Sequence, residues 1–157
     1  MSHVRRHATS GSLFTRDHAG WTGIPDVGTP GAASSPVTDS SVFRVVTRRS
    51  DFQNVAVSFG PDVQGFAPAP GGTDLSWQSV HVFLRYQSPA LLYAVSVDRQ
   101  DGRVVIKKKV PGGPNNGGTY YTLGTAYEHA MSGRWEQVKV SATNSGANVV
   151  LSVGARR

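Results

Sequence analysis

The stretch that decides the fold is residues 80–110, which read VHVFLRYQSPALLYAVSVDRQDGRVVIKKKV. Apolar residues recur at every second position from Val80 to Tyr86 and again from Leu91 to Val97. This period of two is typical of half-buried β-strands. A turn near Ser88 pairs each even-numbered residue of the first strand with an odd-numbered residue of the second. Both apolar sets then lie on one face, as burial requires.

The next turn extends this pattern to a third strand. Asp101-Gly102 separates two apolar-patterned runs, and glycine tolerates the positive φ that a two-residue hairpin turn demands. Pairing Gln100 with Arg103 across this turn leaves Lys108 pointing inward, where it must snorkel at an edge unless a bulge intervenes. On the face opposite the apolar sets, we expect a basic surface made of His81, Arg85, Ser96, Lys107 and Lys109.

The rest of the chain has the same alternation between turn-rich stretches. Eighteen glycines and nine prolines in 157 residues suit a β protein with many turns. The pattern predicts strands over Ser12–Arg16, Val42–Arg48, Phe52–Phe59, Ser79–Gln87, Leu91–Asp98, Arg103–Val110, Thr119–Leu123, Trp135–Ala142 and Asn148–Val153. We expect loops over Gly60–Asp74 and Pro111–Gly118, and a turn or short helix over Thr125–Met131. The predicted class is all-β.

Composition excludes several kinds of site and partner. The chain has no cysteine, so disulfides, thiolate metal sites and a cysteine nucleophile are excluded. Residues 1–11 lack the apolar stretch of a signal peptide, and no run has the roughly 20 apolar residues of a membrane span. The net charge of +6 favours acidic partners. Nucleic acid is not the expected partner, because the basic residues are spread along the chain without a recognition helix or stacking motif.

Four segments resemble the concanavalin A-like lectin/glucanase superfamily, in particular laminin-G-like sandwich domains of secreted bacterial proteins. They are Gly11–Asp26 (GSLFTRDHAGWTGIPD), Val42–Phe59 (VFRVVTRRSDFQNVAVSF), Trp77–Leu123 and Gly133–Ser141 (GRWEQVKVS). The resemblance implies an antiparallel two-sheet β-sandwich of the jelly-roll kind, with a concave face that holds carbohydrate. It also implies secretion, although the chain shows no signal peptide.

The resemblance also implies a domain organisation. We expect a disordered or irregular leader over residues 1–10 and one sandwich domain over residues 11–157. Domains of this kind usually have further strands after the equivalent of Asn148–Val153, so the domain is expected to lack its C-terminal strands. A missing strand would leave a sheet edge or a core face uncovered.

The positions of the carboxylate residues argue against a glycoside hydrolase of this superfamily. Retaining glucanases need two carboxylates about 5–5.5 Å apart. The only glutamates, Glu128 and Glu136, lie in different segments. A polysaccharide lyase needs a cation and a base, which could come from His81, Arg85, Lys107 and a tyrosine such as Tyr120 or Tyr121. We therefore expect a non-catalytic carbohydrate-binding domain, with a polysaccharide-active enzyme, a lyase before a glycoside hydrolase, as the alternative.

The expected ligand is a polysaccharide, and the basic face favours an acidic one. The candidate ligand-binding residues are His81, Arg85, Lys107, Lys109, Trp77 and Tyr120. Tyr120 and Tyr121 are neighbours and must point to opposite faces. Trp135 is expected in the core. No cofactor or metal site is expected, since no histidines have ligand spacing; calcium at Asp98 or Asp101 is conceivable but nothing indicates it.

Overall fold

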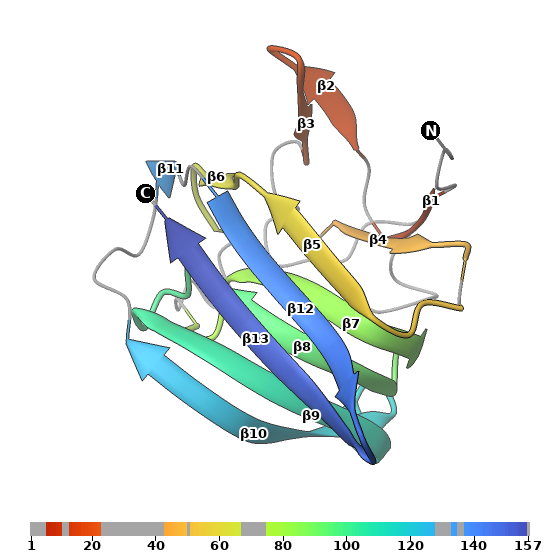
Figure 1. Ribbon diagram of the computed structural model, residues 1–157. Coiled ribbons are helices and arrows are strands. Elements are labelled where there is room, and N and C mark those ends of the chain that lie inside the picture. The colour runs from red at the N-terminus through yellow and green to blue at the C-terminus, as the bar shows by residue number, and fades with distance from the viewer. Residues whose placement is uncertain are drawn as a thin grey trace. The chain divides into compact units, whose positions relative to one another are not determined.

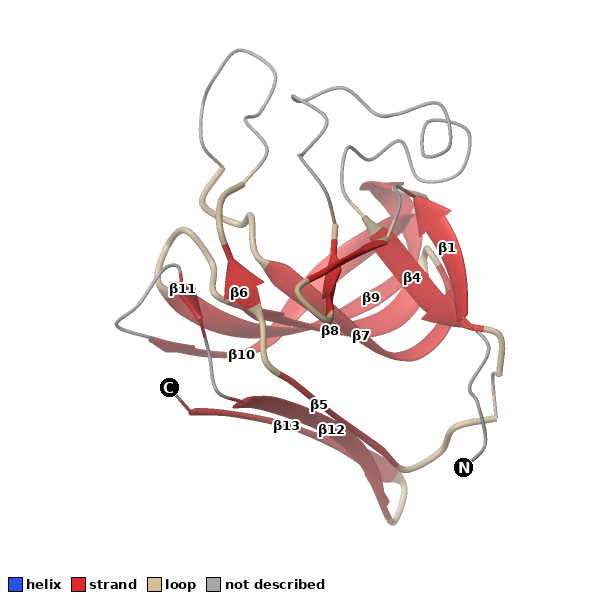
Figure 2. Ribbon diagram, turned by 90° about the horizontal axis from the view of Figure 1, so that it is seen from above, coloured by secondary structure: helices blue, strands red, loops and turns tan. Residues whose placement is uncertain are grey.

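The structure is a computed structural model that describes residues 6–10, 13–22, 43–49, 51–66, 75–127, 133–134 and 137–156. In these ranges the chain forms antiparallel strands and no helix (Figure 2). The predicted all-β class is therefore confirmed. Consequently no described segment is a helix long and apolar enough to cross a membrane. The expected core residue Trp135 and residues 67–74 of the long loop lie outside the described residues.

The chain divides into two compact units, and the expected single domain over residues 11–157 stays a prediction. The first unit comprises Met1–Ser50 and Phe66–Asp74, and the second comprises Asp51–Gly65 and Leu75–Arg157. The first unit has two strand pairs. One pairs β1 (Arg6–Ser10) with β4 (Arg44–Thr47), and the other pairs β2 (Phe14–Arg16) with β3 (Ala19–Trp21). Strand β1 lies in the segment expected to be an irregular leader.

The second unit contains the sheet to which residues 80–110 belong, together with two further sheets (Figure 1). A four-stranded sheet has the order β10-β9-β8-β7, made of Gly118–Tyr127, Arg103–Asn115, Leu91–Val97 and Val80–Ser88. A three-stranded sheet has the order β13-β12-β5, made of Asn148–Arg156, Gln137–Ser145 and Val55–Phe59. The short strands β6 (Asp62–Val63) and β11 (Gly133–Arg134) pair with each other.

The hydrophobic core of the second unit draws on both larger sheets. Its buried residues are Leu84, Val95, Val97 and Val104 from the four-stranded sheet and Val138, Val140 and Ala142 from β12. Val80 and Val82 pack against this cluster, as the alternation predicted. Val80 pairs with Val97, so even-numbered residues of β7 lie opposite odd-numbered residues of β8, as expected. Burial of these alternating side chains supplies the driving force that holds the register.

The turn between β8 and β9 differs from the prediction. Ser96 pairs with Val105, whereas a two-residue Asp101-Gly102 turn would pair Ser96 with Lys107. The backbone N–H of Gly102 instead donates to the Arg99 carbonyl at 2.9 Å, and Gly102 has φ of 68°. A turn followed by a glycine in the left-handed region is a longer hairpin loop. The two-residue shift preserves the face on which each β9 side chain lies.

The glycine-rich stretch Pro111–Gly118 is mostly strand, contrary to the prediction of a loop. Strand β9 continues to Asn115 and β10 begins at Gly118. Asn116 and Gly117 have φ of 47° and 75° and form a two-residue turn, which needs positive φ at both positions. Further along β10, Thr125–Tyr127 stays paired with β9 beyond a bulge, so the turn or short helix predicted there is also wrong over these residues.

A bulge in β7 overturns the predicted placement of Arg85. Regular pairing stops after Leu84 and resumes at Ser88, and Arg85 has φ of 51°. The Arg85 Nη2 donates to the Oδ1 of Asn144 on β12 at 2.7 Å. Three residues of β7, 85–87, therefore lie opposite Leu92 alone, and within such a bulge the side chains leave the regular alternation. Arg85 is thereby directed toward the three-stranded sheet, and Tyr86, predicted on the core face, stacks on Phe83 instead.

We predict that Asn144→Ala lowers the free energy of unfolding by about 1 kcal/mol, because Arg85 Nη2 loses its acceptor while the buried Nε of Arg85 has no hydrogen-bond partner in the described part of the chain. Urea unfolding measures the change. Asn148→Ala, across the turn of the same hairpin, is the control and should shift stability by less than about 0.5 kcal/mol. Equal effects of the two substitutions would contradict a specific Arg85–Asn144 link.

Candidate functional site

The side chains on the side of the four-stranded sheet opposite the core cluster differ in character from strand to strand. We call this side the outer face. Cross-strand pairing and ring stacking assign to it His81, Phe83 and Tyr86 on β7, Leu92, Ala94 and Ser96 on β8, Arg103, Val105, Lys107 and Lys109 on β9, and Tyr120, Thr122, Thr125 and Tyr127 on β10. Aromatic rings thus line β7 and small or apolar buried side chains line β8. Three cations and the buried Val105 lie on β9, and hydroxyl-bearing side chains line β10. His81 and Lys107 share this face, as predicted.

The rings along β7 form a continuous row. The His81 and Phe83 ring centroids are 6.5 Å apart with planes inclined by 9°. The Phe83 and Tyr86 centroids are 6.2 Å apart with planes inclined by 23°. Stacked rings of this kind present flat apolar surface together with the polar edges of histidine and tyrosine. The bulge at Arg85 brings Tyr86 into this row, which simple alternation of residues could not show.

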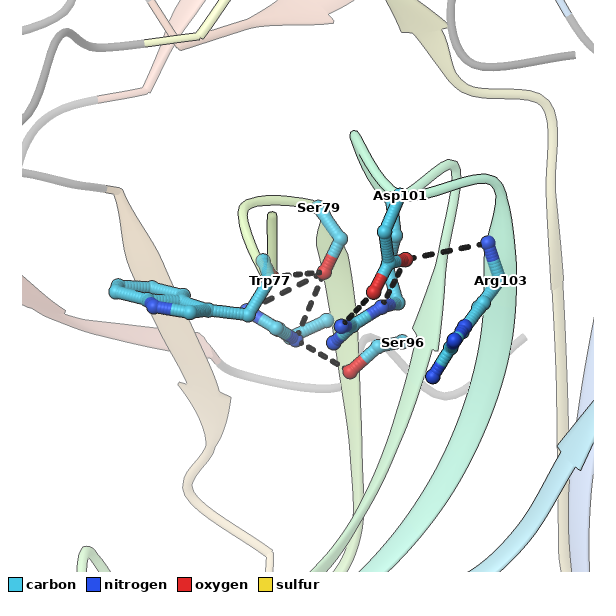
Figure 3. Close-up of polar contacts among 7 residues, drawn as sticks. Trp77, Ser79, Ser96, Asp101 and Arg103 are labelled. Atoms are coloured by element: carbon cyan, nitrogen blue, oxygen red, sulfur yellow. Dashed lines mark hydrogen bonds and ion pairs between the residues drawn. The ribbon is translucent and has the colours of Figure 1, made fainter. Parts of the chain in front are cut away.

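The hydroxyl groups of Ser79 and Ser96 lie within hydrogen-bonding distance of His81 (Figure 3 labels both serines). Its Nδ1 lies 2.8 Å from Ser96 Oγ, and Ser79 Oγ lies 3.2 Å from the same nitrogen. Ser79 Oγ also donates to the Trp77 carbonyl oxygen at 3.2 Å. The indole of Trp77 points away from this cluster and is 51% exposed. The imidazole is therefore fixed in position by two hydroxyl groups, while the indole stands free beside them.

Arg99 and Asp101, both in the turn after β8, form a partly buried ion pair. Arg99 Nε donates to Asp101 Oδ1 at 2.8 Å, and Arg99 Nη2 donates to Oδ2 at 2.5 Å. The same carboxylate accepts the backbone N–H of Arg103 at 3.2 Å (Figure 3). Hydrogen bonds from Arg99 hold the pKa of the Asp101 carboxyl below its ordinary value. Arg99 is only 6% exposed, so its charge is fixed within the site.

Lys107 is a half-buried cation on the outer face. Its backbone position pairs with Ala94 on β8 and Thr122 on β10. Its ammonium nitrogen lies 5.6 Å from the centroid of the Tyr120 ring, within cation–π range. Burial lowers the pKa of Lys107, and the positive charge of Arg99 lowers it further. The Asp101 carboxylate acts in the opposite direction and offsets part of the effect of Arg99.

Lys109 is not an exposed cation, contrary to the expectation for the basic face. It is 2% exposed, and its ammonium donates to the Pro89 carbonyl oxygen at 2.6 Å. The same nitrogen lies 4.8 Å from the Tyr120 ring centroid. The side chain fits only because position 118 is glycine, since a Cβ there would meet Lys109 Cε at 2.7 Å. Lys109 therefore anchors the turn between β7 and β8.

The six predicted site residues thus separate into groups. His81, Lys107, Lys109 and Tyr120 share the outer face, Trp77 lies beside it, and Arg85 reaches Asn144 instead. Sequence reasoning missed the charge of Arg99 and the ring of Tyr86. Arg99 could have been suspected from its spacing to Asp101 in a turn. Lys108 points inward as expected and is exposed, in agreement with snorkelling at the edge of the core.

The geometry bears on catalysis and metal binding. The lyase alternative relied on Arg85 converging with His81 and a tyrosine, but the Arg85 guanidinium is engaged with Asn144. In the segments that the structure describes, no group of three histidine, aspartate or glutamate side chains could hold a metal ion. What the face offers chemically is flat rings, hydroxyl groups and cations, which suit binding of a polar ligand.

We predict that Asp101→Asn lowers the free energy of unfolding by about 2 kcal/mol at pH 7, because Arg99 stays buried without its counter-charge. Since the folded-state pKa of Asp101 is depressed, its stabilising effect is present above the ordinary carboxyl pKa and disappears as the pH falls through the lowered value. The difference between wild type and variant should therefore shrink below pH 3.8. Urea unfolding of the wild type and the variant at pH 7 and at pH 3 tests this.

Asp17→Asn provides the matched control, because Asp17 forms an exposed ion pair with Arg16 and the change in charge is the same. Its effect should be close to zero at both pH values. An Asp101→Asn effect that stays constant from pH 7 to pH 3 would contradict the assigned ion pair.

Comparison of the whole chain with protein-family models, with curated proteins and with solved structures finds no match. The resemblance to concanavalin A-like domains therefore rests on the sequence segments quoted above, and the function has to be argued from the site itself.

Proposed function

We propose that the second unit is a two-sheet sandwich that binds carbohydrate on its outer face without catalysing a reaction. The row of rings formed by His81, Phe83 and Tyr86 is the observation that carries the proposal. Flat rings contact the apolar faces of sugar rings, while hydroxyl and cationic groups meet the sugar hydroxyls. The core cluster shared by the two larger sheets supports the sandwich arrangement.

The distribution of hydrogen-bonding groups supports a sugar ligand in particular. On one side of the buried β8 residues lie the aromatic side chains of β7. On the other side lie Lys107 and, on β10, the exposed hydroxyls of Thr122 and Thr125. A polymer lying across β8 would therefore contact rings on one flank and hydrogen-bonding groups on the other. Affinity would come from several weak contacts acting together, as polar contacts at an exposed surface contribute little individually.

The proposal predicts that Phe83→Leu weakens binding of polysaccharide by about tenfold while leaving the fold intact. Leucine retains apolar bulk but removes the ring from the middle of the row, and aromatic contacts of this kind are worth about 0.5–1.5 kcal/mol beyond area burial. A glycan array first identifies a polymer that binds, and calorimetry with that polymer then measures the affinities.

Tyr121→Leu is the matched control, because Tyr121 is a 54% exposed aromatic residue of β10 whose pairing with Lys108 puts it on the opposite side of the same sheet. Its affinity should match that of the wild type within about twofold. Absence of binding to every glycan on the array would refute the proposed function. Equal weakening by both substitutions would place the binding surface elsewhere.

A further inference from the structure

The turn after β8 brings a surplus of positive charge to one end of the outer face. Arg99, Arg103 and Lys107 carry the cations, and the carboxylates there are Asp98 and Asp101. Asp101 is engaged by Arg99 through two side-chain hydrogen bonds. The Arg103 guanidinium lies 5.3 Å from the centroid of the Tyr127 ring, and Arg103 donates a hydrogen bond to Asp101 through its backbone N–H. The local balance therefore favours an anion.

One nitrogen of the Arg99 guanidinium takes no part in the contact with Asp101. Its Nε and Nη2 are held by Asp101, whereas its buried Nη1 has no hydrogen-bond partner among the described residues. A buried cationic donor without an acceptor costs free energy, and an anion bound nearby reduces that cost through charge attraction. Because the bidentate contact with Asp101 fixes the guanidinium plane, the direction in which Nη1 points is fixed as well.

Lys107 is the cation through which a ligand would approach. It is half-buried beside the fixed charge of Arg99, and its flexible four-carbon stem allows the ammonium to move toward an incoming group. An anion placed there would be attracted by both cations in surroundings where burial reduces screening by water. Lys109 is not available for this purpose, because its ammonium is committed to Pro89.

We propose that this end of the outer face is a subsite for an oxyanion substituent of a glycan, either a carboxylate or a sulfate ester, with Lys107 as the contacting cation and Arg99 as the buried second charge. This inference rests on the proposed function and specifies its ligand as an acidic polysaccharide. Arg85, which the sequence favoured as the anionic anchor, is replaced by Arg99 because the bulge removes Arg85 from the face.

The test compares Lys107→Gln with Lys108→Gln. Both substitutions remove one positive charge from the same strand, but Lys108 is exposed on the opposite side of the sheet. Calorimetry would use polygalacturonate as the carboxylate polymer, dextran sulfate as the sulfate polymer and dextran as the neutral polymer. Lys107→Gln should weaken binding of at least one acidic polymer about tenfold, as expected for loss of a charge-assisted hydrogen bond. The acidic polymer that loses affinity identifies the oxyanion.

Further measurements separate a subsite from a general effect of charge. Lys107→Arg should retain binding within about threefold of wild type, and binding of dextran should not change in either glutamine variant. Equal losses in Lys107→Gln and Lys108→Gln, or no loss in Lys107→Gln, would overturn the subsite while leaving carbohydrate binding in place. Failure of the wild-type protein to bind any of these polymers, together with an empty glycan array, would overturn the proposed function itself.

Discussion

Strand β8 is buried on both of its faces, and the sheet around it depends on that constraint. Val95 and Val97 enter the core cluster on one face, while Ala94 and Ser96 are buried on the other. A slip of one residue would exchange the two sets and put a serine hydroxyl into the hydrophobic core. The register of β8 therefore fixes that of β7 and β9, and with it the face on which the candidate binding residues lie.

Much of this arrangement could be predicted from the sequence because burial enforces a period of two. The all-β class, the odd parity between β7 and β8 and the common face of His81 and Lys107 all follow from alternation. The period of two also explains why the wrongly predicted turn between β8 and β9 did not change the predicted faces of the β9 side chains. A shift of two residues changes each cross-strand partner but leaves every side chain on its face.

The errors arose where the chain departs from regular pairing. The bulge at Arg85 depends on a positive φ in a residue that is not glycine, and on an acceptor 59 positions away at Asn144. The local alternation of apolar residues shows neither the positive φ of Arg85 nor its contact with Asn144. At the glycine-rich tip of β9 and β10 the error was the opposite one, because a loop was predicted where the chain is mostly strand. The glycines there serve a two-residue turn inside a long hairpin. Lys109 was misjudged because its burial depends on a carbonyl of another turn.

The lysines of β9 show how position divides residues of one type into different roles. Lys108 is exposed on the side of the core, Lys109 is buried as a structural link, and Lys107 stays beside Arg99 on the outer face. A net charge of +6 would by itself favour many acidic partners. The surface proposed for binding depends instead on one lysine and a fixed arginine next to a row of rings. Its specificity would therefore come from geometry more than from total charge.

The most direct test of the central claim is a map of amide chemical-shift changes on adding a polysaccharide that binds on the glycan array. If the outer face is the binding surface, the largest changes should follow residues 81–86 on β7 and residues 103–109 on β9, and the three-stranded sheet should be little affected. Changes concentrated on β12 and β13, with β7 and β9 unaltered, would contradict the account.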